Sequence, residues 1–263
     1  MSAAQSTQQD WTLAELCITA AAEAWRGDGE KLASGMGVIP RLAAGLAKLT
    51  FSPDLLMTDA ESVLVREPVP LGPRRAGYEM HIEGWMPFRK VFDLLWAGRR
   101  HAMTMPTQID RFGNINISFI GDPKKPKAQL LGVRGIPGNT INHPSSFFVP
   151  RHTPRSFVAR VDMASGVGYD PARWAPGVRR DFVELRLVVS DLAVLDFQGP
   201  DHAMRIRSLH PGVTAERVQE QTSFELAIAP DVHETPAPGP EELRLIREVL
   251  DPNGLRDSVF SEK

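Results

Sequence analysis

The chain has 263 residues, of which 42% are hydrophobic and 24% are charged, as in a globular protein with a sizeable core. Its net charge of -2 comes from interspersed acidic and basic residues, which argues against nucleic-acid binding, and no apolar run reaches the ~18 residues of a membrane span. The single cysteine, Cys17, excludes an internal disulfide, and the polar N-terminus predicts no signal peptide, so a cytoplasmic protein is expected.

The first half of the chain alternates helix-forming and strand-forming patterns. Thr12 and Glu15 have the spacing of a capping box, and apolar residues then recur at helical intervals up to Gly27, which ends this helix. Cys17 lies on the apolar face and is assigned to core packing. The patterns that follow predict a strand into Gly35, a helix with Pro40 in its first turn, strands at 53–58 and 61–65, a loop at 74–87, a helix at 88–98 and a strand at 101–105.

The second half is richer in strand patterns. Residues 184–197 predict a hairpin that turns at Ser190 and Asp191. A Pro-rich linker at 234–242 precedes a C-terminal helix that begins at Pro240. The other elements predicted here are strands at 112–121, 128–133, 145–149, 156–161 and 223–228, and a short helix within 211–221.

Strands that alternate with helices are typical of a parallel sheet covered by helices. The predicted fold class is therefore α/β, with a mostly parallel sheet flanked by helices and an antiparallel hairpin in the second half. No composition shift marks a boundary inside the main body. We predict a single domain over 1–263, in which 234–263 is a Pro-rich linker and a C-terminal helix able to dock separately.

A glycine pair at the predicted turn from strand to helix is a first candidate site. Gly35 and Gly37 match half of a dinucleotide fingerprint, but Pro40 takes the place of the third glycine and no ribose-binding acid follows at the required spacing. NAD binding is therefore not expected. A tight turn and a contact to an anion or a substrate are both compatible with this pattern.

The segment 132–143 is a second candidate site, because it places glycines and polar residues between two apolar strands. Glycines let the backbone approach a ligand closely, and free N–H groups in such a loop form a site for an oxyanion. The alternative is a solvated surface loop. The candidate substrate-binding residues are Arg134, Gly135, Gly138, Asn139 and Asn142.

Glu61 is the candidate catalytic residue. It follows one short apolar run and precedes another, and a carboxylate at the end of a buried strand is suited to act as a nucleophile or general base. Burial raises the pKa of such a carboxyl and so favours proton transfer. The alternative is a glutamate that only accepts hydrogen bonds from loop N–H groups.

Other catalytic and metal-binding patterns are not found in the sequence. The seven histidines have no zinc-binding spacing, and only His143 falls in a candidate site segment. Neither a nucleophile elbow nor a phosphate-binding loop is present. We therefore expect no metal.

Long segments of the chain resemble a known family. Residues 37–62, 108–135 and 208–226 are similar to the beta subunits of class I coenzyme A (CoA) transferases, in the glutaconate-transferase branch, and the resemblance runs from about residue 12 to 257. The strings IEGWMPF, GVRGIPGNTINH, DFQGPDHAMR and DPNGLRD resemble a narrower group, the CoA-transferase-like hydrolases that open the last steroid ring in bacterial cholesterol degradation. The resemblance implies a CoA-transferase fold.

The resemblance also bears on Glu61. In the transferases this subunit carries Ser-Glu-Asn-Gly, whose glutamate attacks an acyl-CoA thioester and then carries the CoA. The corresponding residues here, Ala60-Glu61-Ser62-Val63, keep the glutamate and lose the Asn-Gly pair. Valine crowds the space beside the nucleophile. This departure fits a hydrolase in which Glu61 is a supporting group or is silent, and in which the alpha subunit supplies the main acid or base.

The reaction implied by the resemblance is water addition to a cyclic β-keto or enone acyl-CoA, followed by retro-Claisen-type carbon–carbon cleavage. CoA is then part of the substrate, and no cofactor is needed. The 132–143 segment is the candidate source of oxyanion donors: Asn139 and Asn142 either hold the loop or touch the substrate, and Arg134 pairs with a substrate carboxylate or a CoA phosphate.

The resemblance further implies a homologous alpha subunit, in an α2β2 assembly, joined through an apolar interface. The aromatic residues considered for this interface, as alternatives to core positions, are Trp85, Phe88, Phe147 and Phe148. Two other functions stay open: a glutaconate-type CoA transferase with Glu61 as its nucleophile, and a non-catalytic scaffold subunit.

Overall fold

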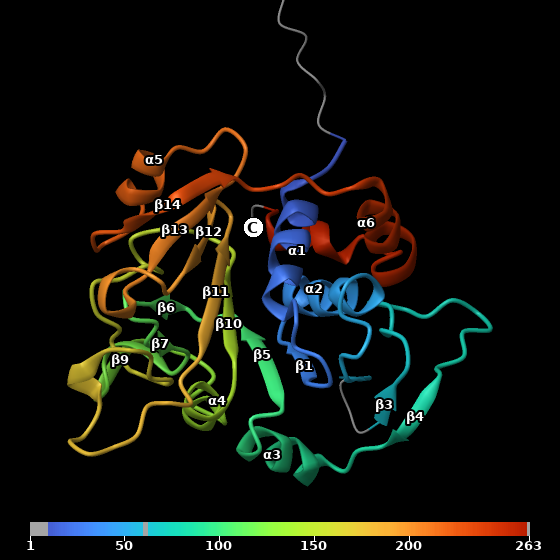
Figure 1. The fold of residues 1–263 in the computed structure, drawn as a ribbon, viewed down its shortest axis with the longest axis horizontal. Helices are drawn as coiled ribbons and strands as arrows, with labels where there is room; N and C mark the ends of the chain where they lie inside the picture. Colours follow the sequence, from blue (N-terminus) through green and yellow to red (C-terminus); the bar gives the residue numbers. More distant parts are fainter. Residues whose placement is uncertain (1–9, 60–62, 262–263) are drawn as a thin grey trace, which may run out of the picture.

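The computed structural model describes residues 10–59 and 63–261. Within these residues the largest sheet has seven strands in the order β1-β5-β10-β11-β12-β13-β14 (Figure 1). Neighbouring strands are parallel except at the pairs β11–β12 and β12–β13, so the predicted mostly parallel sheet and its hairpin are confirmed. The strands are β1 (Leu32–Gly35), β5 (Arg100–Thr104), β10 (Ser145–Val149), β11 (Leu185–Ser190), β12 (Ala193–Asp196), β13 (Arg205–Leu209) and β14 (Ala227–Glu234).

Smaller sheets depart from the sequence-based predictions. β4 lies inside the predicted loop 74–87, and the predicted strand 112–121 is two strands, β7 and β8, that belong to different sheets. The predicted strand 156–161 is wrong, because only Phe157 makes a bridge, to Ile109. These pairings depend on which strand edge lies nearby, and local periodicity does not contain that information. The strands are β2 (Met57–Thr58), β3 (Val63–Val65), β4 (Ile82–Trp85), β6 (Gln108–Ile109), β7 (Ile115–Asn116), β8 (Phe119–Asp122) and β9 (Lys125–Gln129).

The helices are mostly where the sequence predicts them. The capping box at Thr12 and Glu15 is present, and Pro40 lies in the first turn of its helix. The exception is the predicted loop 132–143, which contains α4. In the described part of the chain no helix is long and apolar enough to cross a membrane. The helices are α1 (Leu13–Ala22), α2 (Val38–Leu49), α3 (Phe88–Trp96), α4 (Ile136–Asn142), α5 (Ala215–Glu220) and α6 (Pro240–Arg244), which runs into a π-helical turn (Leu245–Leu250).

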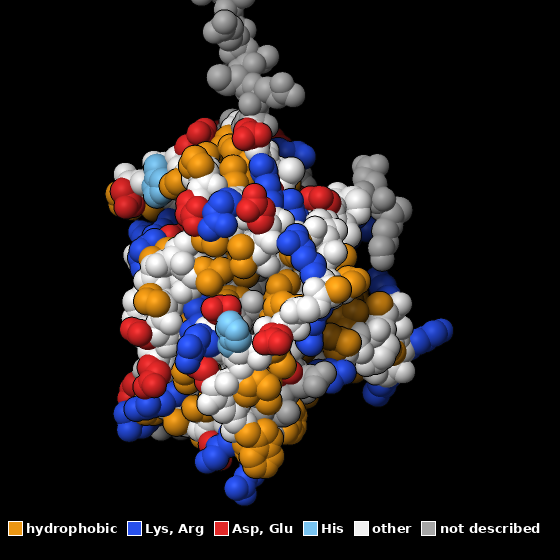
Figure 2. Space-filling view, turned by 90° about the vertical axis from the view of Figure 1, so that its right-hand side faces the viewer, with side chains coloured by type: hydrophobic (Ala, Val, Ile, Leu, Met, Phe, Trp, Pro, Cys, Tyr) orange, Lys and Arg blue, Asp and Glu red, His pale blue; other side chains and the backbone are white. Residues whose placement is uncertain are grey.

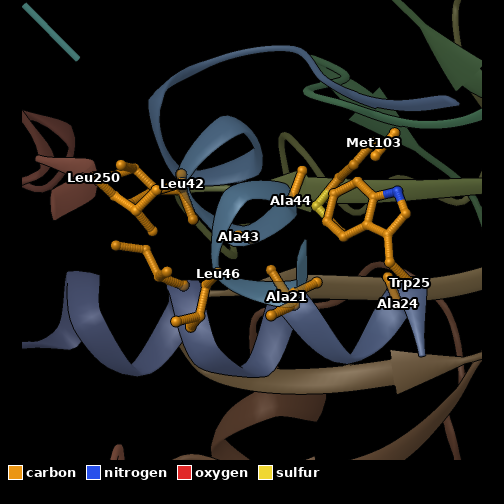
Figure 3. Packing of buried hydrophobic residues seen from close by; sticks show 14 of the residues in the cluster. Ala21, Ala24, Trp25, Leu42, Ala43, Ala44, Leu46, Met103 and Leu250 are labelled. Atoms are coloured by element: carbon orange, nitrogen blue, oxygen red, sulfur yellow. The ribbon is translucent and has the colours of Figure 1, made fainter. Parts of the chain in front are cut away.

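Helices α1 and α2 pack against each other on one face of the sheet (Figure 1). Small side chains such as Ala21 and Ala44 lie where the two helices meet, with Trp25 beside Met103 at one end and Leu250 at the other (Figure 3). Because Leu250 belongs to the C-terminal segment, that segment packs into the same hydrophobic core. Cys17 is fully buried in this core, as predicted, and burial raises the pKa of its thiol well above the usual value.

A buried carboxylate links the first helix to the C-terminal segment. Glu15 caps the backbone of Thr12 and also accepts hydrogen bonds from Arg247 and Arg256, at 2.7 and 3.2 Å. Burial opposes its ionisation, but these two arginines and the cap outweigh that cost, and the pKa of Glu15 is lowered. A charged, fully paired Glu15 therefore fixes the C-terminal segment against α1.

The edge of the sheet at β1 and β5 separates two environments. Side chains alternate across a strand, so His101 and Met103 point towards the helices α1 and α2, whereas Arg100 and Thr104 point to the opposite face. On that opposite face lie α3 and α4. The candidate functional site lies on this face.

Candidate functional site

A cavity of about 510 Å³ lies between α3, α4 and β5. Most of its wall is apolar, and the polar side chains in it are Arg100, Thr104, Arg134 and Asn139. A cavity of this size, with apolar walls and few polar groups, is typical of a small-molecule site. The apolar wall includes Phe88, Phe92, Leu95, Met105, Leu131 and Ile136.

A second cavity, of about 260 Å³, adjoins the first. The two share Met36, Phe88, Val91 and Arg100 in their walls, and the second is also lined by Met57 and Thr58 of β2. Glu61 follows Thr58, a residue of this cavity wall, by three positions in the sequence. Glu61 itself lies outside the described residues.

The glycine pair near β1 is explained by close backbone contacts. A Cβ atom at Gly35 would lie 2.2 Å from the carbonyl oxygen of Pro40, so only glycine fits where β1 turns into α2. Gly37 has φ of 119°, a value that side chains disfavour, and it caps α2. Tight-turn geometry therefore accounts for both glycines, although Gly35 also lines the second cavity.

The structure divides the predicted substrate-binding residues into two groups. Arg134, Gly135 and Asn139 line the large cavity. Gly138 packs against α3, where an added Cβ would lie 3.4 Å from Leu95, and the Asn142 amide donates to the Gly138 carbonyl at 2.8 Å. Of the roles considered for the two asparagines, Asn142 therefore holds the segment, and Asn139 faces the cavity.

The expectation of an oxyanion nest of free backbone N–H groups in 132–143 is wrong for most of this segment. The N–H groups of Ile136, Gly138 and Asn139 donate within the turn and helix that begin there, at 3.1 to 3.2 Å. Amides already bonded in a helix are not available to a ligand. Arg134 at the entrance to α4 has φ of 47°, an uncommon conformation for a residue with a side chain, and such positions cluster at functional sites.

Side-chain groups without a partner lie in the same region. Among the described residues, Thr104 Oγ1 and Asn139 Oδ1 are buried in the cavity wall with no hydrogen-bond partner. Leaving a buried polar group unpaired costs about 1–3 kcal/mol, which a bound ligand or water recovers. Thr104 was not predicted as a site residue, although the alternation that puts polar Arg100 and Thr104 on one face of β5 was an available signal.

Arg100 is the most unusual group in these walls. It is only 8% exposed, and its Nε donates to Ser34 Oγ at 2.9 Å. Among the described residues no carboxylate lies within 4.0 Å of it, and burial alone lowers the pKa of its guanidinium. The charge of Arg100 adds to burial in lowering the pKa of nearby His143 to about 4, so that histidine is neutral near pH 7.

A second polar cluster has the connectivity of a serine–histidine–aspartate triad. His101 Nδ1 donates to Asp28 at 2.6 Å, and its Nε2 accepts from Ser146 Oγ at 2.9 Å. All three residues are buried on the α1–α2 side of the sheet, and none lines either cavity near α3. A hydroxyl that no substrate reaches is not a nucleophile, so this cluster is structural.

Asp28 of that cluster contributes to stability. Although burial raises its pKa, the bonds to His101 and Lys31 and the charge of Arg186 outweigh burial and lower that pKa to about 2. We expect Asp28→Asn to lower the free energy of unfolding at pH 7 by about 2–4 kcal/mol. Because the folded pKa lies below the unfolded one, this stabilisation is present above pH ~4 and is lost towards pH ~2.

Urea unfolding of wild type and of Asp28→Asn at pH 7, 4 and 2 measures this difference in the free energy of unfolding. The matched control is Glu23→Gln, which removes an exposed carboxylate paired with Arg26 and should change stability by less than about 0.5 kcal/mol. If Asp28→Asn had the same free energy of unfolding as wild type at pH 7, the assignment of a stabilising role to Asp28 would be contradicted.

Within the described residues no group of three or more His, Cys, Asp or Glu side chains is arranged to hold a metal ion. The polar groups that line the two cavities are therefore the guanidinium groups of arginines and neutral polar side chains. These groups suit binding of a substrate with an apolar body, acid–base chemistry and stabilisation of a developing negative charge on oxygen.

Known proteins are similar to this chain over most of its length. The cholesterol ring-cleaving hydrolase IpdB subunit of Rhodococcus jostii RHA1 is 51% identical over 95% of this chain and 96% of its own length. The crystal structure of IpdAB from the same organism matches with a TM-score of 0.88 and 50% identity, over 96% of this chain and 100% of that chain.

A more distant relative connects the chain to the transferases. The B subunit of the glutaconate CoA-transferase of Acidaminococcus fermentans is 30% identical over 86% of this chain and 87% of its own length. No family model matches the sequence. The predicted CoA-transferase fold and family resemblance are confirmed, and this chain belongs to the family of the cholesterol ring-cleaving hydrolase IpdB subunits, within the wider group of CoA-transferase B subunits.

Proposed function

We propose that this chain is the beta subunit of a hydrolase that opens a ring of a cyclic acyl-CoA formed in cholesterol breakdown. The observation that carries this proposal is the 51% identity over nearly the whole chain with the ring-cleaving hydrolase subunit of Rhodococcus jostii. The apolar cavity of about 510 Å³ beside α3 supports it, because a ring with few polar substituents suits such walls.

The proposed reaction is hydrolytic cleavage of a carbon–carbon bond. Water adds to a ring ketone, and the bond between that carbon and the carbon next to the thioester then breaks. The ketone carbon becomes a carboxylate, and the bonding electrons form a thioester enolate that takes up a proton. CoA belongs to the substrate, so the reaction needs no further cofactor or metal, and we place it in the cytoplasm, where the lone thiol Cys17 stays reduced.

The residues of this chain have separate roles in that reaction. Thr104 and Asn139 are unpaired polar groups in the cavity wall, and we assign them to the oxygen atoms of the substrate or of the attacking water. Glu61, three residues after Thr58 in the sequence, is assigned to proton transfer. Arg134 is exposed at the rim and is assigned to the anionic CoA moiety.

A homologous alpha subunit completes the site in this proposal. Trp85, Phe88 and Trp96 are 75%, 71% and 65% exposed, and Phe88 lines both cavities. Figure 2 shows hydrophobic side chains gathered at the lower end of the molecule, where α3 lies in Figure 1. Exposed aromatic groups of this kind mark protein interfaces. Phe147 and Phe148, also considered for the interface, are instead in the core. We propose an α2β2 assembly.

The experiment that tests the function uses the complex. We expect this chain, co-expressed with a homologous alpha subunit, to co-purify with that subunit, and the complex to convert a cyclic β-keto acyl-CoA to a product heavier by one water molecule. Mass spectrometry of the products and of the intact CoA thioester measures this. Recovery of the substrate unchanged across a panel of cyclic acyl-CoAs would contradict the proposal.

A CoA transferase is the second candidate, favoured by the 30% identity with one subunit of a glutaconate CoA-transferase and by the retained Glu61. A transferase forms a thioester between Glu61 and CoA, which borohydride reduces irreversibly. We expect borohydride to leave the activity of the complex unchanged after mixing with acyl-CoA. Inactivation with modification at Glu61 would favour the transferase.

A further inference from the structure

Helix α4 and the end of β5 concentrate buried polar atoms that lack a partner. In residues 10–59 and 63–261, the fully enclosed side-chain atoms without a hydrogen-bond partner are Thr104 Oγ1, Asn139 Oδ1, Thr140 Oγ1 and His143 Nε2. Three of these residues lie in α4 or directly end it, and Thr104 lines the same cavity as Asn139. Folded proteins pair nearly all of their buried polar atoms, so this group of atoms indicates a shared partner.

The ring of His143 has a fixed polarity. Its Nδ1 lies 2.9 Å from the carbonyl oxygen of Pro144, and because a carbonyl only accepts, Nδ1 carries the proton. Nε2 is therefore an acceptor, and a pKa of about 4, lowered mainly by burial, keeps the ring neutral near pH 7. His143 is 1% exposed and does not line the large cavity, so its Nε2 lies behind the cavity wall.

The three unpaired atoms at α4 match the bonding capacity of one water molecule. Asn139 is four residues before His143 and Thr140 is three residues before it, which are the spacings of neighbouring side chains on a helix. A water molecule donates two hydrogen bonds, and Asn139 Oδ1 and His143 Nε2 are acceptors. It accepts a third bond from the Thr140 hydroxyl. Buried water molecules typically make about three hydrogen bonds of this kind.

The same arrangement gives the amide of Asn139 a direction. Its fully enclosed atom is Oδ1, which leaves Nδ2 as the end of the amide that faces the large cavity. The terminal torsion of an asparagine is broad, and a hydrogen bond to Oδ1 from behind the wall holds Nδ2 towards the cavity as a donor. A donor held in this way stabilises negative charge that develops on a substrate oxygen.

We propose that His143 is a positioning residue that, together with Thr140, holds a buried water molecule behind the cavity wall and thereby fixes the amide of Asn139 as an oxyanion donor. This inference rests on the proposed function, in which negative charge develops on the oxygen of a thioester enolate. His143 contacts neither the substrate nor the attacking water, and none of its covalent bonds changes. Its loss should therefore lower kcat and leave KM nearly unchanged.

Two substitutions of His143 separate the roles of its two nitrogen atoms. Asparagine places its terminal group near the position of Nδ1 and keeps a donor for Pro144, whereas glutamine reaches the position of Nε2 and keeps an acceptor for the water. In the complex with the alpha subunit, His143→Asn should lower kcat for a cyclic β-keto acyl-CoA by ~10-fold or more. His143→Gln should stay within ~3-fold of wild type. Steady-state kinetics measure kcat and KM of each complex.

A control separates this effect from a loss of stability. His152 is also buried, its two ring nitrogens bond Ser190 and Thr222, and it lines neither cavity near α3. His152→Asn should therefore lower the unfolding temperature by about 2 °C or more and leave kcat of the complex unchanged. Thermal unfolding of each complex without substrate measures this temperature.

Thr140 provides a second test of the same water molecule. Thr140→Val keeps the shape of the side chain and removes the hydroxyl, so it should lower kcat by less than His143→Asn does. The double variant should lose no more than His143→Asn alone, because both substitutions release one water molecule. A crystal structure of the wild-type complex without substrate should show this water within hydrogen-bond distance of His143 Nε2 and Asn139 Oδ1.

The inference is overturned if kcat of His143→Asn equals or exceeds that of His143→Gln, since His143 would then act through its bond to Pro144. Losses that add in the double variant, or a crystal structure without a water at Nε2, would also overturn it. A wild-type complex that cleaves no cyclic acyl-CoA would instead refute the proposed function. The two failures are distinguishable, because the crystal structure reports on the water molecule whether or not the complex turns over.

Discussion

Replacement of Glu61 by glutamine is expected to slow ring opening by the assembled complex by about 100-fold or more, the usual loss when an acid–base group is removed. The side chain keeps its size and loses only its ability to take up and release a proton. The chain enters and leaves residues 60–62 through β2 and β3, and β2 contributes Met57 and Thr58 to the second cavity. Steady-state kcat and KM of the complex measure the effect.

The control for this experiment is Glu67→Gln. Glu67 follows β3 and is exposed, and its carboxylate lies 3.5 Å from His81 Nδ1, so its replacement should leave kcat unchanged. A Glu61→Gln complex that turns over at nearly the wild-type rate would show that Glu61 is silent. The acid and base would then belong to the alpha subunit, and this chain would act as a scaffold with a binding role.

Replacement of Trp96 by aspartate is expected to weaken assembly with the alpha subunit by ~100-fold or more. Trp96 is 65% exposed at the end of α3, and large aromatic side chains at the centre of an interface commonly account for 2 kcal/mol or more of binding each. A charge at this position adds the cost of burying an unpaired carboxylate. Size-exclusion chromatography and titration of the purified subunits measure the dissociation constant.

The matched control is Phe182→Asp. Phe182 is 59% exposed, but it lies near Arg179 in a segment that contributes to neither cavity near α3. We expect this variant to assemble normally. Because Trp96 is exposed, its replacement should leave the unfolding temperature of the separate subunit unchanged, so a loss of assembly is not a folding defect. Normal assembly of Trp96→Asp would place the alpha subunit on another face.

The sequence was most informative where a local pattern has one physical solution. The capping box of Thr12 and Glu15 needs only the first turn of α1 to form, and Pro40 suits a first helical turn in any fold. The hairpin of β11 and β12 is also local, since it joins neighbouring segments through a short turn. The family resemblance then connected these elements with a CoA-transferase fold and a ring-cleaving hydrolase, and the similar proteins confirm both.

The candidate site was predicted less well, because its properties depend on neighbours far apart in the chain. The segment 132–143 was found, but its helix α4 and the role of Gly138 follow from contact with α3. Arg100 was not singled out, since nothing in the sequence around it reveals that no carboxylate among the described residues reaches it. Its importance lies in a missing contact, which only three-dimensional distances disclose.

The apolar face of α3 illustrates the same division. Periodicity alone determined that Phe88, Phe92 and Trp96 share one face of a helix. Only the tertiary structure decided that this face is exposed beside the cavities, whereas the apolar faces of α1 and α2 are buried. The physical reason is that periodicity depends on the residues of one helix, whereas burial depends on what packs against that helix, and those atoms come from distant parts of the chain or from another subunit.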